Sequence, residues 1–337
     1  MSETSESLAF LRECPAIDLH ADTLMWGRWL GYDVLKRHEA PLPMAALGGH
    51  VDVPRMKDGG LGAQFFSLVS LPFVGQGGMG KIVHEQIDVL EQWIAASKGA
   101  LSLALSAEDL ERAEKEKRVV GLLGIEGAHA LGGKLAPLDA FAKRGVRYLG
   151  LLHFSANEVG SPAYGKGANT NGLTSFGHSV VERCNDLGVI VDLSHINRAG
   201  FLEACQRTQS PVIVSHTGIL GAFDHWRNID DEQLRAVANK GGCIGVIFVP
   251  RYLGADGLEP VVKHLKHIID VVGEDVPALG SDWDGFVVPT KELADPRGLP
   301  HLATALLEHG FEERVVRKIF RENALRVLRD VPFRAAP

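Results

Sequence analysis

Short, nearly continuous apolar runs alternate along the chain with longer stretches in which apolar residues recur at helical spacing. Apolar runs without polar alternation are typical of strands that are buried on both faces, as in parallel sheets. The longer stretches indicate helices with one apolar face. Eight of the runs are predicted as strands: residues 17–20, 63–69, 119–125, 148–153, 189–194, 212–215, 244–249 and 278–280.

The helical stretches between these runs carry their own start and stop signals. Ser175 is placed to cap the start of a helix over residues 176–188, and Gly188 is placed to end it. Residues 231–242 and 312–328 follow the same pattern, and the mixed charges of residues 111–118 indicate a solvated helix end. The helix predicted over residues 84–96 has one apolar face, which consists of Ile87, Leu90, Trp93 and Ile94.

Eight buried strands, each followed by a helix, predict an α/β protein built on a (β/α)8 TIM barrel. The whole chain, residues 1–337, is expected to form a single barrel domain. Residues 1–14 are expected to be a peripheral N-terminal segment, and residues 330–337 a C-terminal tail. A doubly wound open sheet is the alternative, because it is built from the same alternation of strands and helices.

Polar residues of metal-binding types follow most of the predicted strands. In a barrel the ends of the strands meet at one face, where barrel enzymes build their active sites. Each residue alone has an ordinary explanation, such as a turn carboxylate or a hydrogen-bonded histidine, but those explanations do not predict so many of them at one face. They are His20 and Asp22 after the first strand, Gln64 and Ser67 within the second, and Glu126, His153, His195, His216, Asp282 and Asp284 after later strands.

These side chains predict a metal site. His20 and Asp22 are two positions apart and would project together from one strand. Histidines and carboxylates suit zinc or a similar divalent ion. Glu126 could bridge two ions, because a carboxylate offers two oxygens. Two ions that share a carboxylate and a water or hydroxide are typical of a hydrolase, in which Asp282 would carry the proton to a leaving amine.

Composition narrows the class of protein further. The 337 residues are 45% hydrophobic and 23% charged, as in ordinary globular proteins. A net charge of −7 argues against a surface for nucleic acid or anionic membranes. The sequence contains no signal-peptide pattern and no apolar run long enough for a transmembrane helix, so a cytoplasmic location is expected. Free thiols are expected at the widely spaced Cys14, Cys184, Cys205 and Cys243.

The sequence resembles the membrane dipeptidase (renal dipeptidase) family, peptidase family M19 of the amidohydrolase superfamily. The likeness runs from Ile17 to Leu328, and the block over residues 171–195 is long and specific. The resemblance implies a TIM barrel of the metallo-dependent hydrolase type and a zinc-dependent dipeptidase. The matching motifs are IDLHADT, GGLGAQFFS, GIEG, NGLTSFGHSVVERCNDLGVIVDLSH, VIVSHTG, RNIDDEQL, GSDWDG and ENALRVL.

The resemblance also implies a ligand set for two zinc ions. His20 and Asp22 would bind one ion, His195 and His216 would bind the other, and Glu126 would bridge them. Many amidohydrolases bridge their metals with a carboxylated lysine instead. No lysine ends a predicted strand in this chain, and Glu126 takes the bridging place.

Three further residues match family positions that handle the substrate. His153 is expected to steady the oxyanion of the tetrahedral intermediate, and Asp282 to transfer the proton, with Asp284 as second choice. Arg227, in the motif WRNIDDEQL, is expected to hold the terminal carboxylate of the substrate. A guanidinium can grip a carboxylate with two parallel hydrogen bonds.

The implied substrates are dipeptides, both L,L and those with a D-residue at the C-terminal position, and the implied assembly is a homodimer. No nucleic-acid or membrane partner is expected. Mammalian family members carry a signal peptide, disulfides and a lipid anchor, and this sequence shows none of these. Residues 154–165, with the sequence FSANEVGSPAYG, also lack the residues associated with the mammalian enzymes. Substrate preference is therefore not carried over.

Two other functions fit parts of the pattern. A different metal-dependent hydrolase on the same barrel, such as a deaminase, lactonase or phosphotriesterase, would have no use for Arg227 as a carboxylate clamp. A non-enzymatic binding protein would be expected to lack metal ligands, yet all five are present. The GxxxxGK pattern over residues 75–81 lacks the following Ser or Thr of a phosphate-binding loop, because Ile82 comes next. The remaining histidines are expected to be surface or structural residues.

Overall fold

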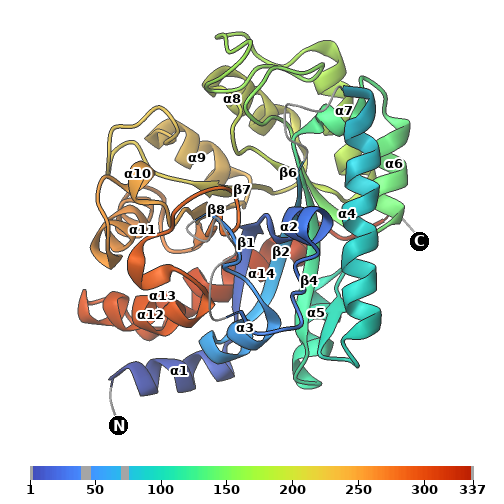
Figure 1. Cartoon of the computed structure of the whole chain (residues 1–337). Coiled ribbons are helices and arrows are strands. Elements are labelled where there is room, and N and C mark those ends of the chain that lie inside the picture. Colours follow the sequence, from blue (N-terminus) through green and yellow to red (C-terminus); the bar gives the residue numbers. More distant parts are fainter. Residues whose placement is uncertain (1–2, 39–46, 70–75, 335–337) are drawn as a thin grey trace.

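Nine parallel strands form one sheet in the computed structural model of the chain, which describes residues 3–38, 47–69 and 76–334 (Figure 1). Eight of these strands close into a barrel, because β2 pairs with β4 as well as with β1. The strands are β1 (Ala16–Ala21), β2 (Leu61–Val69), β3 (Leu101–Leu103), β4 (Val119–Glu126), β5 (Val146–Gly150), β6 (Ile190–Asp192), β7 (Val212–Thr217), β8 (Cys243–Val246) and β9 (Pro277–Leu279).

The closed barrel confirms the predicted fold class and excludes the open doubly wound sheet. All eight predicted strands are present, although the fourth ends at Gly150, so that His153 lies in the loop beyond it. Strand β3 is an addition to the predicted strands, and its three residues include a serine. It pairs with the beginning of β4, from Leu101 opposite Val119 to Leu103 opposite Gly121, and lies outside the closed ring.

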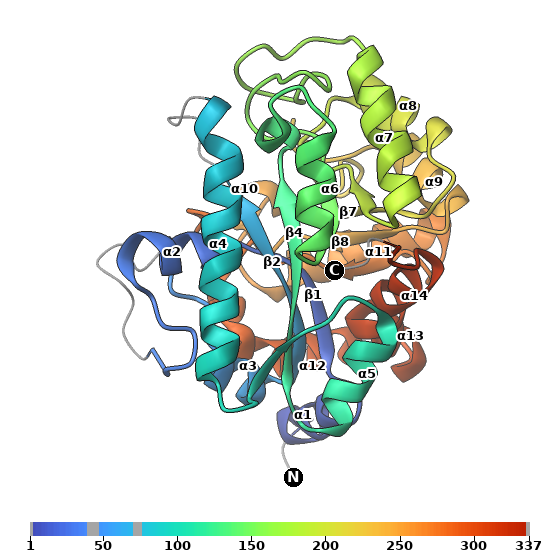
Figure 2. The same ribbon diagram turned by 90° about the vertical axis from the view of Figure 1, so that its right-hand side faces the viewer.

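Helices surround the barrel on its outer side, and the two views show them on opposite flanks of the strands (Figures 1 and 2). They are α1 (Glu3–Glu13), α2 (Thr23–Leu30), α3 (Val53–Gly59), α4 (Gln76–Ala96), α5 (Ala107–Lys115), α6 (Ala136–Lys143), α7 (Ser175–Leu187), α8 (Arg198–Arg207), α9 (Asp231–Asn239), α10 (Pro250–Leu253), α11 (Leu258–Val272), α12 (Leu299–Glu308), α13 (Glu313–Arg317) and α14 (Asn323–Asp330).

Helix α7 allows the predicted capping residues to be compared with the observed ones. Gly188 ends the helix with φ of 67°, a left-handed conformation that glycine adopts without steric cost. The prediction for the start was wrong by one residue. Thr174 is the N-cap, since its backbone is extended and its Oγ1 accepts a hydrogen bond from the Gly177 N–H at 3.0 Å. Ser175 is the first helical residue.

The predicted helix over residues 312–328 is interrupted. A π-helical turn, η4 (Lys318–Glu322), joins α13 to α14. The side chains at this turn anchor it to the barrel: Arg321 pairs with Glu114 and donates to the Pro15 carbonyl, while Asn323 donates to the carbonyls of Glu274 and Pro277. The GxxxxGK pattern is not a loop in its described part, because α4 begins at Gln76; Gly75 lies outside the described residues.

Both chain ends pack on the barrel more closely than the sequence indicated. Helix α1 contacts α12, where the hydroxyls of Ser7 and Thr304 lie 2.8 Å apart. At the other end, the fully buried Arg147 donates to the carbonyls of Gly188 and Val331. All four cysteines are free and buried, as expected for free thiols. Among the helices of the described ranges, none is both long and apolar enough to cross a membrane.

One buried histidine forms contacts with two segments above the barrel, a loop after β7 and helix α10. His264, on α11, accepts a hydrogen bond from the Ile219 N–H at its Nδ1 (2.9 Å) and contacts the Leu253 carbonyl through Nε2 (3.3 Å). Burial lowers the pKa of His264 from 6.5 to about 4. The imidazole is therefore neutral at pH 7, with its proton on Nε2. The structural role expected for this histidine fits these contacts.

His264 should make the fold sensitive to acid. Because its folded pKa lies below the unfolded one, the unfolded chain binds more protons between pH 6.5 and 4. The stabilisation is complete above pH 6.5 and is lost as the pH falls toward 4, by on the order of 3 kcal/mol. Urea unfolding of His264→Gln at several pH values should show a flatter pH dependence than the wild type. An unchanged slope, or an equal change in the exposed control His301→Gln, would contradict this.

Candidate metal centre

A small cavity of about 140 Å³ lies at the carboxyl ends of the barrel strands. Its polar lining consists of residues that the sequence singled out, and its apolar lining comes from the end of β2, from α2 and α10, and from the surrounding loops. The predicted residues in the lining are Asp22, Glu126, His153, His195, His216, Arg227 and Asp282, and the apolar or aromatic ones are Met25, Val69, Phe154, Tyr252, Phe286 and Val287. His20 lies directly behind them and is fully buried.

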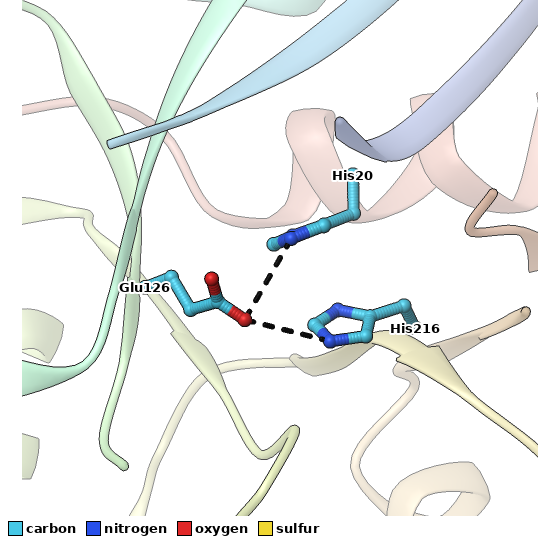
Figure 3. A group of neighbouring side chains, drawn as sticks. All are labelled: His20, Glu126 and His216. Atoms are coloured by element: carbon cyan, nitrogen blue, oxygen red, sulfur yellow. Dashed lines mark ion pairs between the residues drawn. The ribbon is translucent and has the colours of Figure 1, made fainter. Parts of the chain in front are cut away.

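Glu126 is the centre of this cluster. It is the last residue of β4, and its Oε1 lies 2.9 Å from Nε2 of His195, 3.5 Å from Nε2 of His216 and 3.7 Å from Nε2 of both His20 and His153. Figure 3 shows the carboxylate between His20 and His216, which come from β1 and β7. Four imidazoles from four different strands or strand ends therefore converge on one carboxylate oxygen.

The potential ligand atoms fall into overlapping groups, each within 4.8 Å, among the residues that the structure describes. Glu126 belongs to two of them, as a bridging residue would. His195 reaches its group in a left-handed backbone conformation with φ of 67°, and its Nε2 lies 2.9 Å from that of His216. The groups are His20, Asp22 and Asp282; His20, Glu126 and His216; and Glu126, His153 and His195.

Two buried polar atoms in this cluster have no hydrogen-bond partner among the residues that the structure describes. They are Nε2 of His20 and Oδ1 of Asp22, which lie 3.6 Å apart. Asp22 occupies the N-cap position of α2, yet its carboxylate makes no capping bond. Buried polar atoms without partners are costly to a fold unless something satisfies them. Nitrogen and oxygen donors that converge in this way fit a divalent metal ion such as zinc.

Burial keeps three of the imidazoles neutral, which is the form that binds metals. It lowers the pKa of His153 to about 3, and lowers the pKa values of His195 and His216 well below 6.5. Nearby positive charge adds to the effect, from Arg227 at His195 and from His20 at His216. His20 differs: burial would lower its pKa, but the carboxylates of Glu126 and Asp22 outweigh this and raise it to about 10.

The carboxylates repel one another in the same space. Burial raises the pKa of Glu126 well above its usual value, and Asp22 adds to the shift. Burial also raises the pKa of Asp282 to about 7, against the opposing charge of His20. Cations bound among these groups would relieve this repulsion.

Arg227 is a buried cation at the edge of the cavity. One Nη2 hydrogen bond goes to the carbonyl of His216 at 2.8 Å, and Nη1 lies 3.4 Å from Oγ1 of Thr217. No carboxylate among the described residues forms an ion pair with its guanidinium. Burial lowers the pKa of Arg227. An unpaired guanidinium in this position can receive an anionic group of a ligand.

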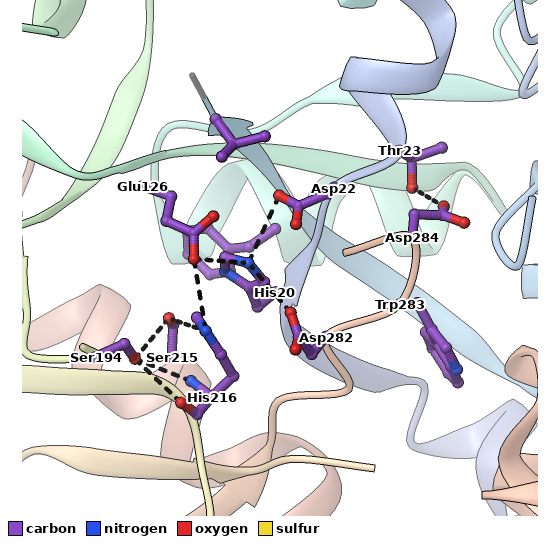
Figure 4. A network of polar contacts seen from close by, with 12 residues as sticks. His20, Asp22, Thr23, Glu126, Ser194, Ser215, His216, Asp282, Trp283 and Asp284 are labelled. Carbon is purple, nitrogen blue, oxygen red and sulfur yellow. Dashed lines mark hydrogen bonds and ion pairs between the residues drawn. The ribbon is translucent and has the colours of Figure 1, made fainter. Parts of the chain in front are cut away.

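Asp282 and Asp284 have different surroundings (Figure 4). Asp282 lines the cavity, and its Oδ1 lies 3.8 Å from Nε2 of His20. Asp284 points away from the cluster, and its carboxylate accepts hydrogen bonds from Thr23 Oγ1 at 2.6 Å and from the His50 N–H at 2.7 Å. Asp284 therefore fixes loops around α2, which leaves Asp282 as the carboxylate that can reach a substrate.

The sequence did not predict the polar residues directly beneath the ligands. Asp192 and Ser215 lie below His216, Tyr148 contacts His20, and Asp18 accepts hydrogen bonds from Gln64 and Ser281 nearby. One signal was present: Asp18 and Asp192 are charged residues inside otherwise apolar strand runs. The apolar cavity wall, including Tyr252 and Phe286, had no comparable signal.

Comparison with known proteins shows which family the chain belongs to. The profile of the membrane dipeptidase family, peptidase family M19, matches residues 5–336. An uncharacterised protein in the pqqA 5′ region of Klebsiella pneumoniae is 37% identical over 74% of this chain and 96% of its own length. Dipeptidase tcpJ of Claviceps purpurea is 32% identical over 86% of this chain and 71% of its own length.

Solved structures give the same result. A metallopeptidase from Rhodobacter sphaeroides, crystallised with a phosphinate mimic of the dipeptide L-Ala-D-Ala, is 27% identical. It superimposes with a TM-score of 0.86 over 94% of this chain and 99% of its own. The family resemblance seen in the motifs is thus confirmed, and with it the expectation of an enzyme rather than a binding protein. The chain belongs to the membrane dipeptidase family, peptidase family M19, and is a metal-dependent dipeptidase.

Proposed function

We propose that the enzyme binds two zinc ions, bridged by Glu126, and hydrolyses the peptide bond of dipeptides. The observation that carries this proposal is the position of Glu126 Oε1, within 3.7 Å of Nε2 of four histidines. A single ion of tetrahedral geometry has no need of so many imidazoles around one carboxylate. Two ions that share this carboxylate would use them.

The ligands divide between the two ions by position. His20 and Asp22 would hold one ion, since their free atoms lie 3.6 Å apart. His195 and His216 would hold the other, since their Nε2 atoms lie 2.9 Å apart. When bound, the zinc ions would lower the pKa of a water molecule and polarise the scissile carbonyl.

Two residues of the chain would serve the reacting atoms. Asp282 would take the proton from the attacking water and deliver it to the leaving amine, because its carboxylate lines the cavity and has a pKa raised by burial to about 7. His153 is a neutral imidazole with one N–H, which would donate to the oxyanion of the tetrahedral intermediate.

The substrate would be a free dipeptide with its terminal carboxylate on Arg227. Arg227 lines the cavity and lacks a carboxylate partner among the described residues, which supports this orientation. The cavity is small, which suits a substrate of two residues. Acceptance of a D-residue at the C-terminal position is supported by the Rhodobacter sphaeroides relative, which was solved with a mimic of L-Ala-D-Ala.

Metal analysis followed by a substrate panel tests the proposal. Protein dialysed against dilute zinc should contain two zinc ions per chain, and chelation should abolish activity. L-Ala-L-Ala and L-Ala-D-Ala should both be hydrolysed, while the N-acetylated dipeptides and tripeptides serve as controls. A single zinc ion in the fully active enzyme would contradict the bridged pair. Absence of hydrolysis of L-Ala-D-Ala would contradict the proposed stereochemical tolerance.

Arg227→Ala should lower kcat/KM for free dipeptides by about 10- to 100-fold, because charge-assisted hydrogen bonds to the substrate carboxylate are lost. Arg227→Lys should recover only part of this, since an ammonium cannot form the two parallel bonds. Steady-state kinetics on free and C-terminally amidated dipeptides measures the effect. The wild type should prefer the free dipeptide, and the Ala variant should lose that preference. Equal cleavage of both by the wild type would refute the role.

A further inference from the structure

A hydrogen-bonded network lies directly beneath the metal centre and begins at Asp192, the last residue of β6. Asp192 is almost fully buried, and its Oδ1 accepts the backbone N–H groups of Ser194 (3.1 Å) and Ser215 (2.8 Å). Its Oδ2 accepts the Ser215 hydroxyl at 2.7 Å. A carboxylate only accepts hydrogen bonds, so the single hydroxyl hydrogen of Ser215 is committed to Asp192.

This commitment decides which nitrogen of His216 carries its proton. The Ser215 Oγ lies 2.9 Å from Nδ1 of His216 and, having given its hydrogen to Asp192, can only accept from that nitrogen. His216 therefore holds its proton on Nδ1, which leaves a lone pair on Nε2. Nε2 is the atom that faces Glu126, at 3.5 Å, and it needs this lone pair to bind a metal ion.

Tyr148 contacts the other histidine above this layer. Its hydroxyl lies 3.0 Å from Nδ1 of His20. Nε2 of His20 points into the metal centre without a hydrogen-bond partner among the described residues.

The residues around Ser215 and Tyr148 hold both side chains in place. The Ser194 Oγ lies 3.0 Å from the Ser215 Oγ and 3.3 Å from the carbonyl of His216, so Ser215 can accept a hydrogen bond from Ser194 as well as from His216 (Figure 4). The tyrosine ring fits inside the barrel only because position 124 is glycine, where a Cβ would lie 2.0 Å from the ring. The Tyr148 side chain is fully buried.

We infer that Asp192, acting through Ser215, is a positioning residue that sets the tautomer of His216 and thereby leaves its Nε2 free to bind a metal ion. In the proposed function, on which this inference rests, His216 holds one of the two zinc ions. Losing the Ser215 hydroxyl should then weaken that ion and leave the ion held by His20 and Asp22 unchanged.

A matched control is available at the end of β9. Ser281 is also a buried serine bound to a buried aspartate: its N–H and its Oγ each lie 2.7 Å from an Asp18 carboxylate oxygen. Its Oγ contacts the backbone carbonyl of His20 at 3.0 Å, and no imidazole contact of Ser281 is seen in the described structure. Ser281→Ala removes the same atoms from a similar environment without touching a ligand nitrogen.

Zinc affinities test the inference. The two Zn²⁺ dissociation constants are measured by competition with a chromophoric chelator for the wild type, Ser215→Ala and Ser281→Ala. We expect Ser215→Ala to raise one constant by about 10- to 100-fold, as loss of an outer-shell partner does at metal sites, and to leave the other unchanged. Ser281→Ala should change neither by more than about twofold.

Two results would overturn the inference: both constants of Ser215→Ala close to those of the wild type, or an equal loss in Ser281→Ala. If Ser215→Ala fails to fold, the tautomer decides instead. In ¹⁵N NMR of the metal-free wild type, the neutral His216 should carry its proton on Nδ1, and a proton on Nε2 instead would refute the network. A wild type that binds fewer than two zinc ions would refute the proposed function, and the same NMR measurement would still decide this inference.

Discussion

Glu126→Gln is expected to lose both zinc ions and to lower kcat/KM by at least about a thousandfold. The amide keeps one oxygen acceptor but replaces the other by an NH2 donor, which cannot bind a cation. The donor would also turn hydrogens toward the Nε2 atoms of His195 and His216, which lie 2.9 and 3.5 Å from Oε1. Zinc content by mass spectrometry and dipeptide hydrolysis should fall together.

The control for this variant removes the same atom from a different carboxylate. Glu114 pairs with Arg321 near the other end of β1, far from any cavity-lining residue along the strand. Glu114→Gln should reduce stability while the folded protein keeps two zinc ions. A Glu126→Gln enzyme that retained both ions with full activity would refute the bridging role.

Asp282→Asn should retain zinc and lower kcat by about 10²- to 10⁴-fold, the range for loss of a positioned general acid–base group. An amide cannot accept the proton of the attacking water or deliver one to the leaving amine. KM for dipeptides should change much less, because Arg227 and not Asp282 is proposed to hold the substrate carboxylate. Steady-state kinetics and metal analysis on the same preparation separate these effects.

Asp284→Asn is the natural comparison, two residues along the chain. Its carboxylate anchors Thr23 and the His50 backbone, so the variant should melt at a lower temperature. Once folded, it should turn over dipeptides at a rate near that of the wild type. If Asp284→Asn lost turnover and Asp282→Asn kept it, the two roles would have to be exchanged.

The fold could be predicted because strands that are buried on both faces can be recognised from their own sequence. Each barrel strand is a nearly continuous apolar run, so that even the first and last strands could be found without knowledge of their partners in the barrel. Strand β3 escaped because its three residues, Leu101–Leu103, include a serine and pair only with the start of β4. The π-helical turn Lys318–Glu322 was not predicted because it is stabilised by contacts with distant segments of the chain. One of them is the hydrogen bond from Asn323 to the Pro277 carbonyl.

The candidate site was predictable for a related reason. The ligands lie at strand ends, so a search after each apolar run finds them, and the family motifs then suggest their roles. The structure brings Asp22, Glu126, His195 and His216 to one cavity, with His20 directly behind it. The layer beneath them was not predictable, since Tyr148 and Ser215 look like ordinary strand residues until the barrel closes. The contact between Tyr148 and His20 joins positions 128 residues apart.

The left-handed backbone at His195 and Asp282, with φ of 67° and 62°, has a consequence for engineering. Side chains with a Cβ adopt this conformation at a cost on the order of 1 kcal/mol each. Glycine would relieve that cost at both positions, yet it would remove an imidazole and a carboxylate from the cavity. Selection of variants for heat resistance alone would therefore favour replacements that erase the chemistry, so any thermostabilisation campaign should hold these two positions fixed.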